Sequence, residues 1–148
     1  MSVRIQRDDF DIGAECDALT GQNRNIGALV TFLGLVRGND DLIALTLEHY
    51  PGMTEREISR HIAAANARWP LLGATVIHRI GRLVPGDRIV FVGVVSSHRK
   101  AAFEVGEFLM DYLKTRAPFW KREDRVSGTV WVEAKSSDED AADRWNAR

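Results

Sequence analysis

The sequence predicts an α+β fold rather than an alternating, doubly wound sheet. Runs rich in branched and aromatic residues indicate strands, and two stretches with apolar residues at intervals of three and four indicate helices. Along the chain these patterns come in the order strands, helix, strands, helix, strands. Because the strands are grouped instead of alternating regularly with helices, the α+β class is favoured.

The first part of the chain is predicted to contain three strands and a short helix. Turn residues at 37–41 separate the second strand from the third. The predicted elements are a strand at Val3–Gln6, a helix around Ala14–Leu19, and strands at Ile26–Val36 and Leu42–His49.

The first long helix is predicted to open at Thr54 and to end before Pro70. Thr54 and Glu57 have the spacing of a capping box, in which each side chain satisfies a free N–H at the helix start. One face of this helix is apolar, and it consists of Ile58, Ile62, Ala65 and Trp69.

The second part begins with two strands, of which the second is apolar enough to be buried on both faces. Ser96 and Ser97 are candidate N-caps for the helix that follows. The predicted elements are strands at Ala74–Ile80 and Arg88–Val95, a helix at Arg99–Thr115, and a hairpin of Phe119–Arg125 with Thr129–Ala134. The core side of the helix is Val105, Phe108, Leu109, Tyr112 and Leu113.

Length and composition are those of a single globular domain spanning residues 1–148. The polar tail, residues 135–148, either forms a last helical turn or stays mobile. A net charge of -1 argues against a nucleic-acid partner, and no apolar run approaches a membrane span. We expect no signal peptide. The single cysteine, Cys16, excludes an internal disulfide, suits a reducing cytoplasm and is expected to serve packing.

The segment KTRAPFWKR, residues 114–122, has four basic residues and no acidic one. Lys114 closes a helix and Lys121 lies on the next strand, so the turn at Pro118 brings two ammonium groups toward each other. Paired lysines can serve as base or nucleophile. A purely structural interpretation stays open, because a lysine at a helix C-terminus complements the dipole and a lysine on an edge strand prevents aggregation.

Two further segments are candidate anion sites. Ser96–Lys100 places His98 and Arg99 at a helix N-terminus, where free N–H groups attract phosphate, although a plain cap explains the same residues. Arg37 stands between Gly34 and Gly38, which would permit a ligand to approach the backbone, although the pattern alone favours a solvent-exposed turn arginine. The remaining histidines show no spacing typical of metal ligands, so no metal or cofactor is predicted.

Several long motifs together resemble the large, catalytic subunit of molybdopterin synthase, the MoaE family. The resemblance covers roughly residues 26–146 and is most extensive at FLMDYLKTRAPFWKRE, residues 108–123. The other motifs are LTLEHYPGMTE at 45–55, VIHRIG at 76–81, PGD at 85–87 followed by IVFVGV at 89–94, SSHR at 96–99 and WVEA at 131–134.

The resemblance implies an α/β-hammerhead type of fold with an additional small antiparallel sheet. It implies sulfurtransferase activity, in which cyclic pyranopterin monophosphate receives two sulfurs and becomes the molybdopterin dithiolene. The implied sulfur donor is the C-terminal Gly-Gly thiocarboxylate of a small ubiquitin-like subunit. The implied assembly is a heterotetramer around a dimer of large subunits.

The resemblance also implies the roles of individual residues. Lys114 and Lys121 match the catalytic lysines of the family. Leu35 departs from the pattern, because some members have lysine there, and this leaves backbone contact as its mode of binding. The substrate-binding positions implied are Leu35, Val36, Arg37, His98, Arg99, Lys114, Lys121, Arg122 and Glu123.

Two alternatives to the enzyme remain. The first is a non-catalytic subunit that docks a ubiquitin-like protein. The second is a small phosphate-ligand or nucleotide-binding protein without a protein partner.

Overall fold

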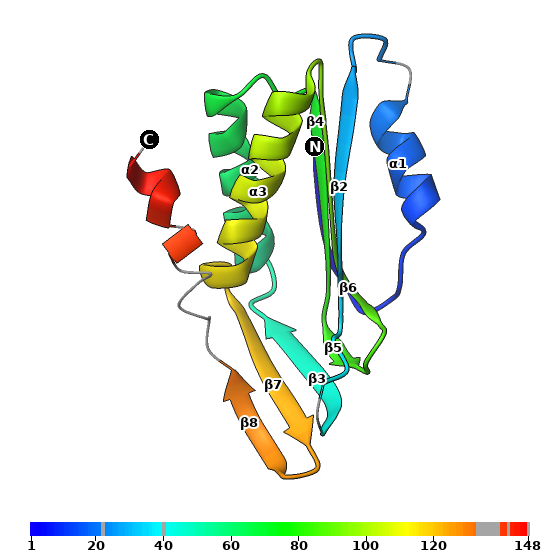
Figure 1. The fold of residues 1–148 in the computed structure, drawn as a ribbon, viewed down its shortest axis with the longest axis vertical. Helices are drawn as coiled ribbons and strands as arrows, with labels where there is room; N and C mark the ends of the chain where they lie inside the picture. The colour runs from blue at the N-terminus through cyan, green and yellow to red at the C-terminus, as the bar shows by residue number, and fades with distance from the viewer. Residues whose placement is uncertain (22, 40, 133–139, 142, 148) are drawn as a thin grey trace.

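A four-stranded sheet, sheet A, stands between the helices in the computed structural model (Figure 1). Its β1–β4 pair is parallel, and its other two pairs are antiparallel. The structure describes every residue except 22, 40, 133–139, 142 and 148. In spatial order the strands of sheet A are β1 (Ser2–Gln6), β4 (Gly73–Arg79), β6 (Arg88–Ser96) and β2 (Ala28–Leu35).

Helices cover both faces of sheet A. On one side are α2 (Met53–Arg68) and α3 (Arg99–Thr115), and on the other is α1 (Ile12–Thr20) (Figure 1). Strand β6 supplies both cores by alternation: Val92 packs in the core with α2 and α3, whereas Phe91 packs with residues of α1. The prediction that this strand is buried on both faces is therefore confirmed.

A second four-stranded sheet, sheet B, lies beyond the C-terminal end of α3 (Figure 1). Its pairs are all antiparallel. The inward face of sheet B packs Leu47 and Leu83 against Val36. In spatial order its strands are β5 (Gly81–Leu83), β3 (Leu42–His49), β7 (Phe119–Arg125) and β8 (Gly128–Val132).

The predicted α+β class with an additional small antiparallel sheet is confirmed. The long helix Arg99–Thr115 has the predicted bounds, and its expected core side is buried throughout. Cys16 packs beside Phe91 in the core under α1, as expected. Strand β5 was not predicted, because a strand of three residues carries too little alternation to be distinguished from a turn.

Both predicted helix caps are wrong. Helix α2 begins at Met53, and it is the N–H of Gly52 that donates to the Glu55 carboxylate, at 3.1 Å. The Thr54 hydroxyl instead accepts from the Tyr50 N–H and donates to the Pro118 carbonyl. At α3 the N-cap residue is His98, and Ser96 donates to the Pro70 carbonyl. Both hydroxyls therefore donate to carbonyl groups elsewhere in the fold and do not cap a helix.

The tail contains a helical turn, η1 (Arg144–Ala147). Of the two alternatives predicted for residues 135–148, a last helical turn is therefore present. Trp145 is buried, and its indole N–H donates to Asp111 of α3 at 2.6 Å. Residues 135–139 of the tail lie outside the described residues. Of the helices in the described part of the chain, none is long and apolar enough to cross a membrane.

Candidate active site

Lys114 and Lys121 stand on either side of the tight turn that joins α3 to β7. Lys114 is exposed in the last turn of the helix, and Lys121 is half-buried on the strand. The backbone N–H groups of Arg116 and Ala117 both donate to the Tyr112 carbonyl, at 2.8 and 3.1 Å. This turn is held further by the Thr54 hydroxyl, so the chain reverses at a fixed place.

His78 of β4 is a buried group close to both lysines. Its ring stacks on Phe119 with 3.9 Å between centroids. Its Nδ1 lies 2.9 Å from the Arg79 carbonyl, which can only accept, so Nδ1 carries the proton and Nε2 is an acceptor. Burial lowers the pKa of His78 to about 3, and the charges of Lys121 and Lys114 contribute to the same shift. Two cations therefore lie near an imidazole that stays neutral.

His49 extends this group. It stands opposite Phe119 in the β3–β7 register, and its charge also acts on the pKa of His78. The His49 Nε2 lies 3.7 Å from Glu55 Oε1, so a carboxylate stands at the edge of this group. We call His49, His78, Lys114 and Lys121 the lysine–histidine cluster. Sequence reasoning missed its two histidines, because it examined them only for metal-ligand spacing.

Cations and a neutral imidazole together suit acid–base chemistry on an anionic substrate. They do not suit a metal, which needs unprotonated ligands on all sides. Across the part of the chain that the structure describes, no group of three or more His, Cys, Asp and Glu residues is arranged to hold a metal ion.

Arg37 borders a separate hollow of about 250 Å³, together with Val36 and Glu123. The backbone of Val36 is engaged, because its N–H donates to Asp87 and its carbonyl accepts from Gly86, each at 2.8 Å. Leu35 is exposed at the end of β2, next to a register shift. Three of the predicted binding residues therefore surround one opening, and Leu35 adjoins it in sequence.

Glu123 is tied into an ion-pair chain at the rim of that hollow. Arg125 donates through Nε to Glu123 at 2.8 Å and through Nη1 to Asp41 at 3.1 Å. Hydrogen bonds from Ser127 and Arg125 lower the pKa of Asp41 to about 2. A ligand that contacts Glu123 therefore contacts a carboxylate whose negative charge is already paired with the Arg125 guanidinium.

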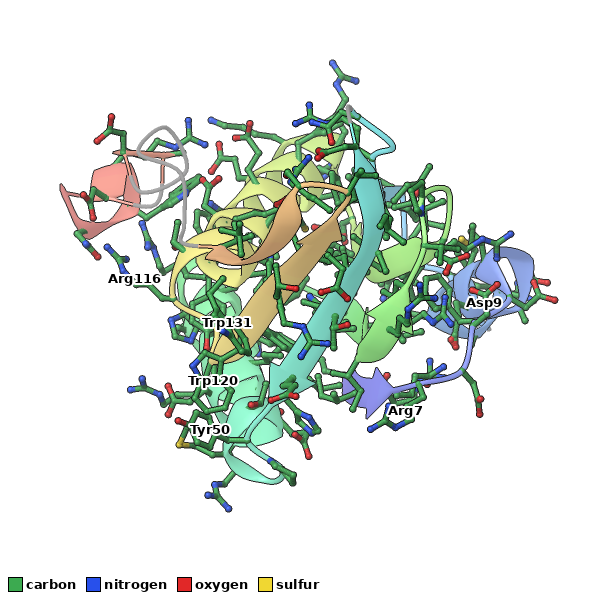
Figure 2. All side chains as sticks on the ribbon, turned by 90° about the horizontal axis from the view of Figure 1, so that it is seen from below. Arg7, Asp9, Tyr50, Arg116, Trp120 and Trp131 are labelled. Atoms are coloured by element: carbon green, nitrogen blue, oxygen red, sulfur yellow. The ribbon has the colours of Figure 1, made fainter. Side chains whose placement is uncertain are left out.

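Arg122 points to the other face of sheet B. Its neighbours in the register are Thr46 and Trp131, whereas Lys121 stands between Leu47 and Val132. Exposed aromatic rings gather on the Arg122 face. The ring centroids of Tyr50 and Trp120 are 4.2 Å apart, and Trp131 is nearby (Figure 2). Adjacent residues of a strand face opposite ways, so Arg122 and Lys121 do not share a pocket within one chain.

His98 and Arg99 lie at the opposite end of α3 from Lys114. At about 1.5 Å per residue, Arg99 and Lys114 are roughly 22 Å apart along the helix. Arg37 is distant from His98 as well, because the antiparallel pairing of β2 with β6 puts Ala28, not Leu35, beside Ser96. The implied substrate-binding positions Lys114 and Lys121 therefore do not share one pocket with His98 and Arg99 within a single chain.

Comparison with known proteins agrees with this architecture. The family model described as "MoaE protein" matches residues 5–116. The molybdopterin synthase catalytic subunit of Pseudomonas aeruginosa strain PAO1 is 54% identical over 148 residues, which cover 98% of this chain and 99% of that protein. The solved MoaE protein of Burkholderia ambifaria has a TM-score of 0.85 at 51% identity, and the match covers 99% of each chain.

A more distant solved structure shows the same fold. It is the complex of subunits 1 and 2 of molybdopterin-converting factor from Helicobacter pylori, with a TM-score of 0.76 at 20% identity, and the match covers 90% of this chain and 92% of that one.

The fold and the lysine–histidine cluster define an α+β protein with a cationic site at the junction of its two sheets. The similarity extends over nearly the whole chain, through both sheets and all three α-helices. The chain belongs to the MoaE family. Membership assigns it an enzymatic role in molybdenum cofactor biosynthesis.

Proposed function

We propose that this chain is the sulfurtransferase subunit that converts cyclic pyranopterin monophosphate to the molybdopterin dithiolene. The observation that carries the proposal is the placement of Lys114 and Lys121 near the buried, neutral His78. The substrate has a cyclic phosphate and the donor tail is anionic, so a cationic site complements both. The reaction belongs in the cytoplasm, where a reducing environment keeps the single thiol of Cys16 free.

In this mechanism the sulfur of a thiocarboxylate attacks a carbon of the bound pterin side chain and displaces an oxygen from it. Water then cleaves the acyl–sulfur bond, which leaves the sulfur on the pterin and an ordinary carboxylate on the donor, and a second donor repeats the step. Lys114, exposed at the helix end, is accessible to the incoming donor. Lys114 and Lys121 offset the charge that develops and move protons. Because His78 is neutral, it adds no positive charge beside the two ammonium groups.

The sulfur donor is a small ubiquitin-like protein that ends in a Gly-Gly thiocarboxylate. Two observations support it. This chain has no cysteine other than Cys16, which packs in the core under α1, so its own residues offer no sulfur carrier at the lysines. The Helicobacter pylori complex, whose chain shares this fold, contains two subunits.

Substrate binding is completed by a second copy of the chain. The phosphate is held by Arg37, His98 and Arg99, with Leu35, Val36, Arg122 and Glu123 as further contacts. Because His98 and Arg99 are roughly 22 Å from Lys114 along α3, they serve the lysines of a neighbouring copy. A symmetric dimer provides two such composite sites, since each copy then gives and receives the same residues.

Mass spectrometry of the pterin tests the proposal. The purified chain is mixed with precursor and with thiocarboxylated small subunit, and we expect a product that contains two sulfurs in place of side-chain oxygens. The small subunit with an ordinary carboxylate is the control and gives no product. A stable complex without product would instead indicate a docking subunit. Phosphate-ligand binding without complex formation would indicate a small-ligand protein.

A further inference from the structure

A second hollow, of about 200 Å³, lies between α2, α3 and η1. Tyr112 lies at its wall, and Lys114 is on the opposite side of the helix, since residues two apart differ by about 200°. This hollow is therefore separate from the lysine–histidine cluster. The polar and aromatic residues that line it are His61, Arg68, Tyr112, Arg116, Trp145 and Asn146.

The hydroxyl of Tyr112 has no hydrogen-bond partner within the part of the chain that is described, although the residue is only 5% exposed. Its ring is stacked on His61 with 3.4 Å between centroids, so the side chain cannot turn the hydroxyl toward solvent. Burial raises the pKa of Tyr112 to about 12, and the group therefore remains a donor at neutral pH. A buried donor without an acceptor is costly, and this indicates a ligand.

Arg68 provides positive charge beside that hydroxyl. Its guanidinium lies over the rings of Trp69 and Phe108, at 4.7 and 5.4 Å from their centroids. Its Nη1 donates to the Trp145 carbonyl at 3.4 Å. No carboxylate of the described residues lies within ion-pair distance of it, whereas the exposed Arg60 on the same helix pairs with Glu57 at 2.8 Å. Stacking thus holds Arg68 in place and leaves its remaining donors available.

Arg116 adds a second guanidinium at the rim, beside the C-terminal segment (Figure 2). It pairs with Asp143 on its exposed side. Asn146, a residue with an amide side chain, belongs to the same lining. Two guanidinium groups, a phenol and an amide offer several donors to one small space, and an anion with several oxygens is the ligand that uses them together.

We propose that this hollow binds a small oxyanion, the phosphate or carboxylate group of a ligand, between Arg68, Arg116 and the Tyr112 hydroxyl. Its volume is ample for such a group and lies below the range of about 300–1,000 Å³ typical of sites for larger ligands. Because the lining comes from α2, α3 and η1, the bound anion joins the C-terminal turn to the helices. The site is independent of the pterin chemistry at Lys114 and Lys121.

Isothermal titration of the purified chain with inorganic phosphate, and separately with acetate, at constant ionic strength tests this site. We expect saturable binding of at least one anion with one site per chain, and the tighter one identifies the ligand class. Arg68→Gln and Tyr112→Phe should each weaken binding by roughly tenfold, the loss typical of one hydrogen bond to a charged group. Arg60→Gln is the matched control and should bind as the wild type does.

Tyr112→Phe keeps the ring stacked on His61 and removes only the unpartnered hydroxyl. Its melting temperature without ligand should therefore equal or exceed that of the wild type. Weaker binding then cannot be attributed to unfolding. The proposal is overturned if neither anion shows saturable binding, or if Tyr112→Phe binds phosphate and acetate as tightly as the wild type. Neither result depends on a sulfur donor or pterin, so it leaves the proposed sulfur transfer untouched.

Discussion

The two ends of helix α3 both contain candidate catalytic or binding residues, but their surroundings differ. At the C-terminal end, Lys114 is followed by a hydrogen-bonded turn, a stacked Phe119 and the buried His78. At the N-terminal end, His98 and Arg99 are exposed, and the His98 side chain makes no capping bond. One end forms a cluster within the chain, and the other presents its side chains outward.

In the proposed mechanism, one chain forms the lysine–histidine cluster by itself, whereas His98 and Arg99 complete the substrate site of a second chain. The lysine–histidine cluster is assembled by contacts within the fold, so its geometry is set before any ligand arrives. His98 and Arg99 are exposed, and in the proposed mechanism they act only together with a second copy of the chain. The predictions below test this division, starting with the largest effect.

Lys114→Ala should abolish most turnover, by a factor of about 10² to 10⁴, the range typical of losing an acid–base group. Its side chain is exposed, so the melting temperature should change little. Single-turnover assays with thiocarboxylated partner, next to thermal melts, measure both quantities. Wild-type turnover in a folded variant would remove Lys114 from the mechanism.

Mixing two inactive variants should restore activity if the ends of α3 from different copies share a site. Lys114→Ala and Arg99→Ala are each expected to be nearly inactive. After unfolding and refolding together, half of the dimers are mixed, and one site of each mixed dimer is intact. The mixture should therefore recover about a quarter of wild-type turnover. No recovery, with mixed dimers present by mass spectrometry, would place both residues in the same chain's site.

Stability should fall on acidification because His78 stays neutral in the folded chain. Its pKa is about 3 when folded and near the ordinary 6.5 when unfolded. Below pH 6.5 the unfolded chain binds a proton there that the folded chain does not, so stability is fully present above 6.5 and decreases toward pH 3. His61, whose pKa is lowered by burial, acts in the same direction.

Melting temperatures of the wild type, His78→Gln and the exposed-site control His98→Gln between pH 7.5 and 5 measure this effect. The slope against pH should be shallower in His78→Gln only. An identical slope in all three proteins would show that His78 titrates normally in the fold.

Arg122→Ala should have the smallest effect on turnover, less than about tenfold, whereas Lys121→Ala should match Lys114→Ala. The two residues are neighbours in sequence but lie on opposite faces of β7. Comparing kcat with KM for the two variants is the measurement. A loss from Arg122→Ala as large as that from Lys121→Ala would mean that the two faces of β7 contribute equally to turnover.

Periodicity in the sequence predicted the central elements well. The bounds of α3, β3 and β7 agree with the prediction, because each depends on the apolar spacing of neighbouring residues. The return of the chain at Pro118, which brings Lys121 back toward Lys114, was predictable for the same reason. The caps were not, since Thr54 and Ser96 are occupied by partners far along the chain.

The sequence by itself therefore determined the α+β class, the helix that ends in Lys114 and the strand that presents Lys121. Only the tertiary structure decided that His78 is buried beside them and that no contact within the chain brings His98 and Arg99 to them from the far end of α3. The physical reason is range. Helix and strand patterns are properties of residues a few positions apart, whereas burial, charge clusters and shared pockets arise from residues that meet only when the sheets and helices pack.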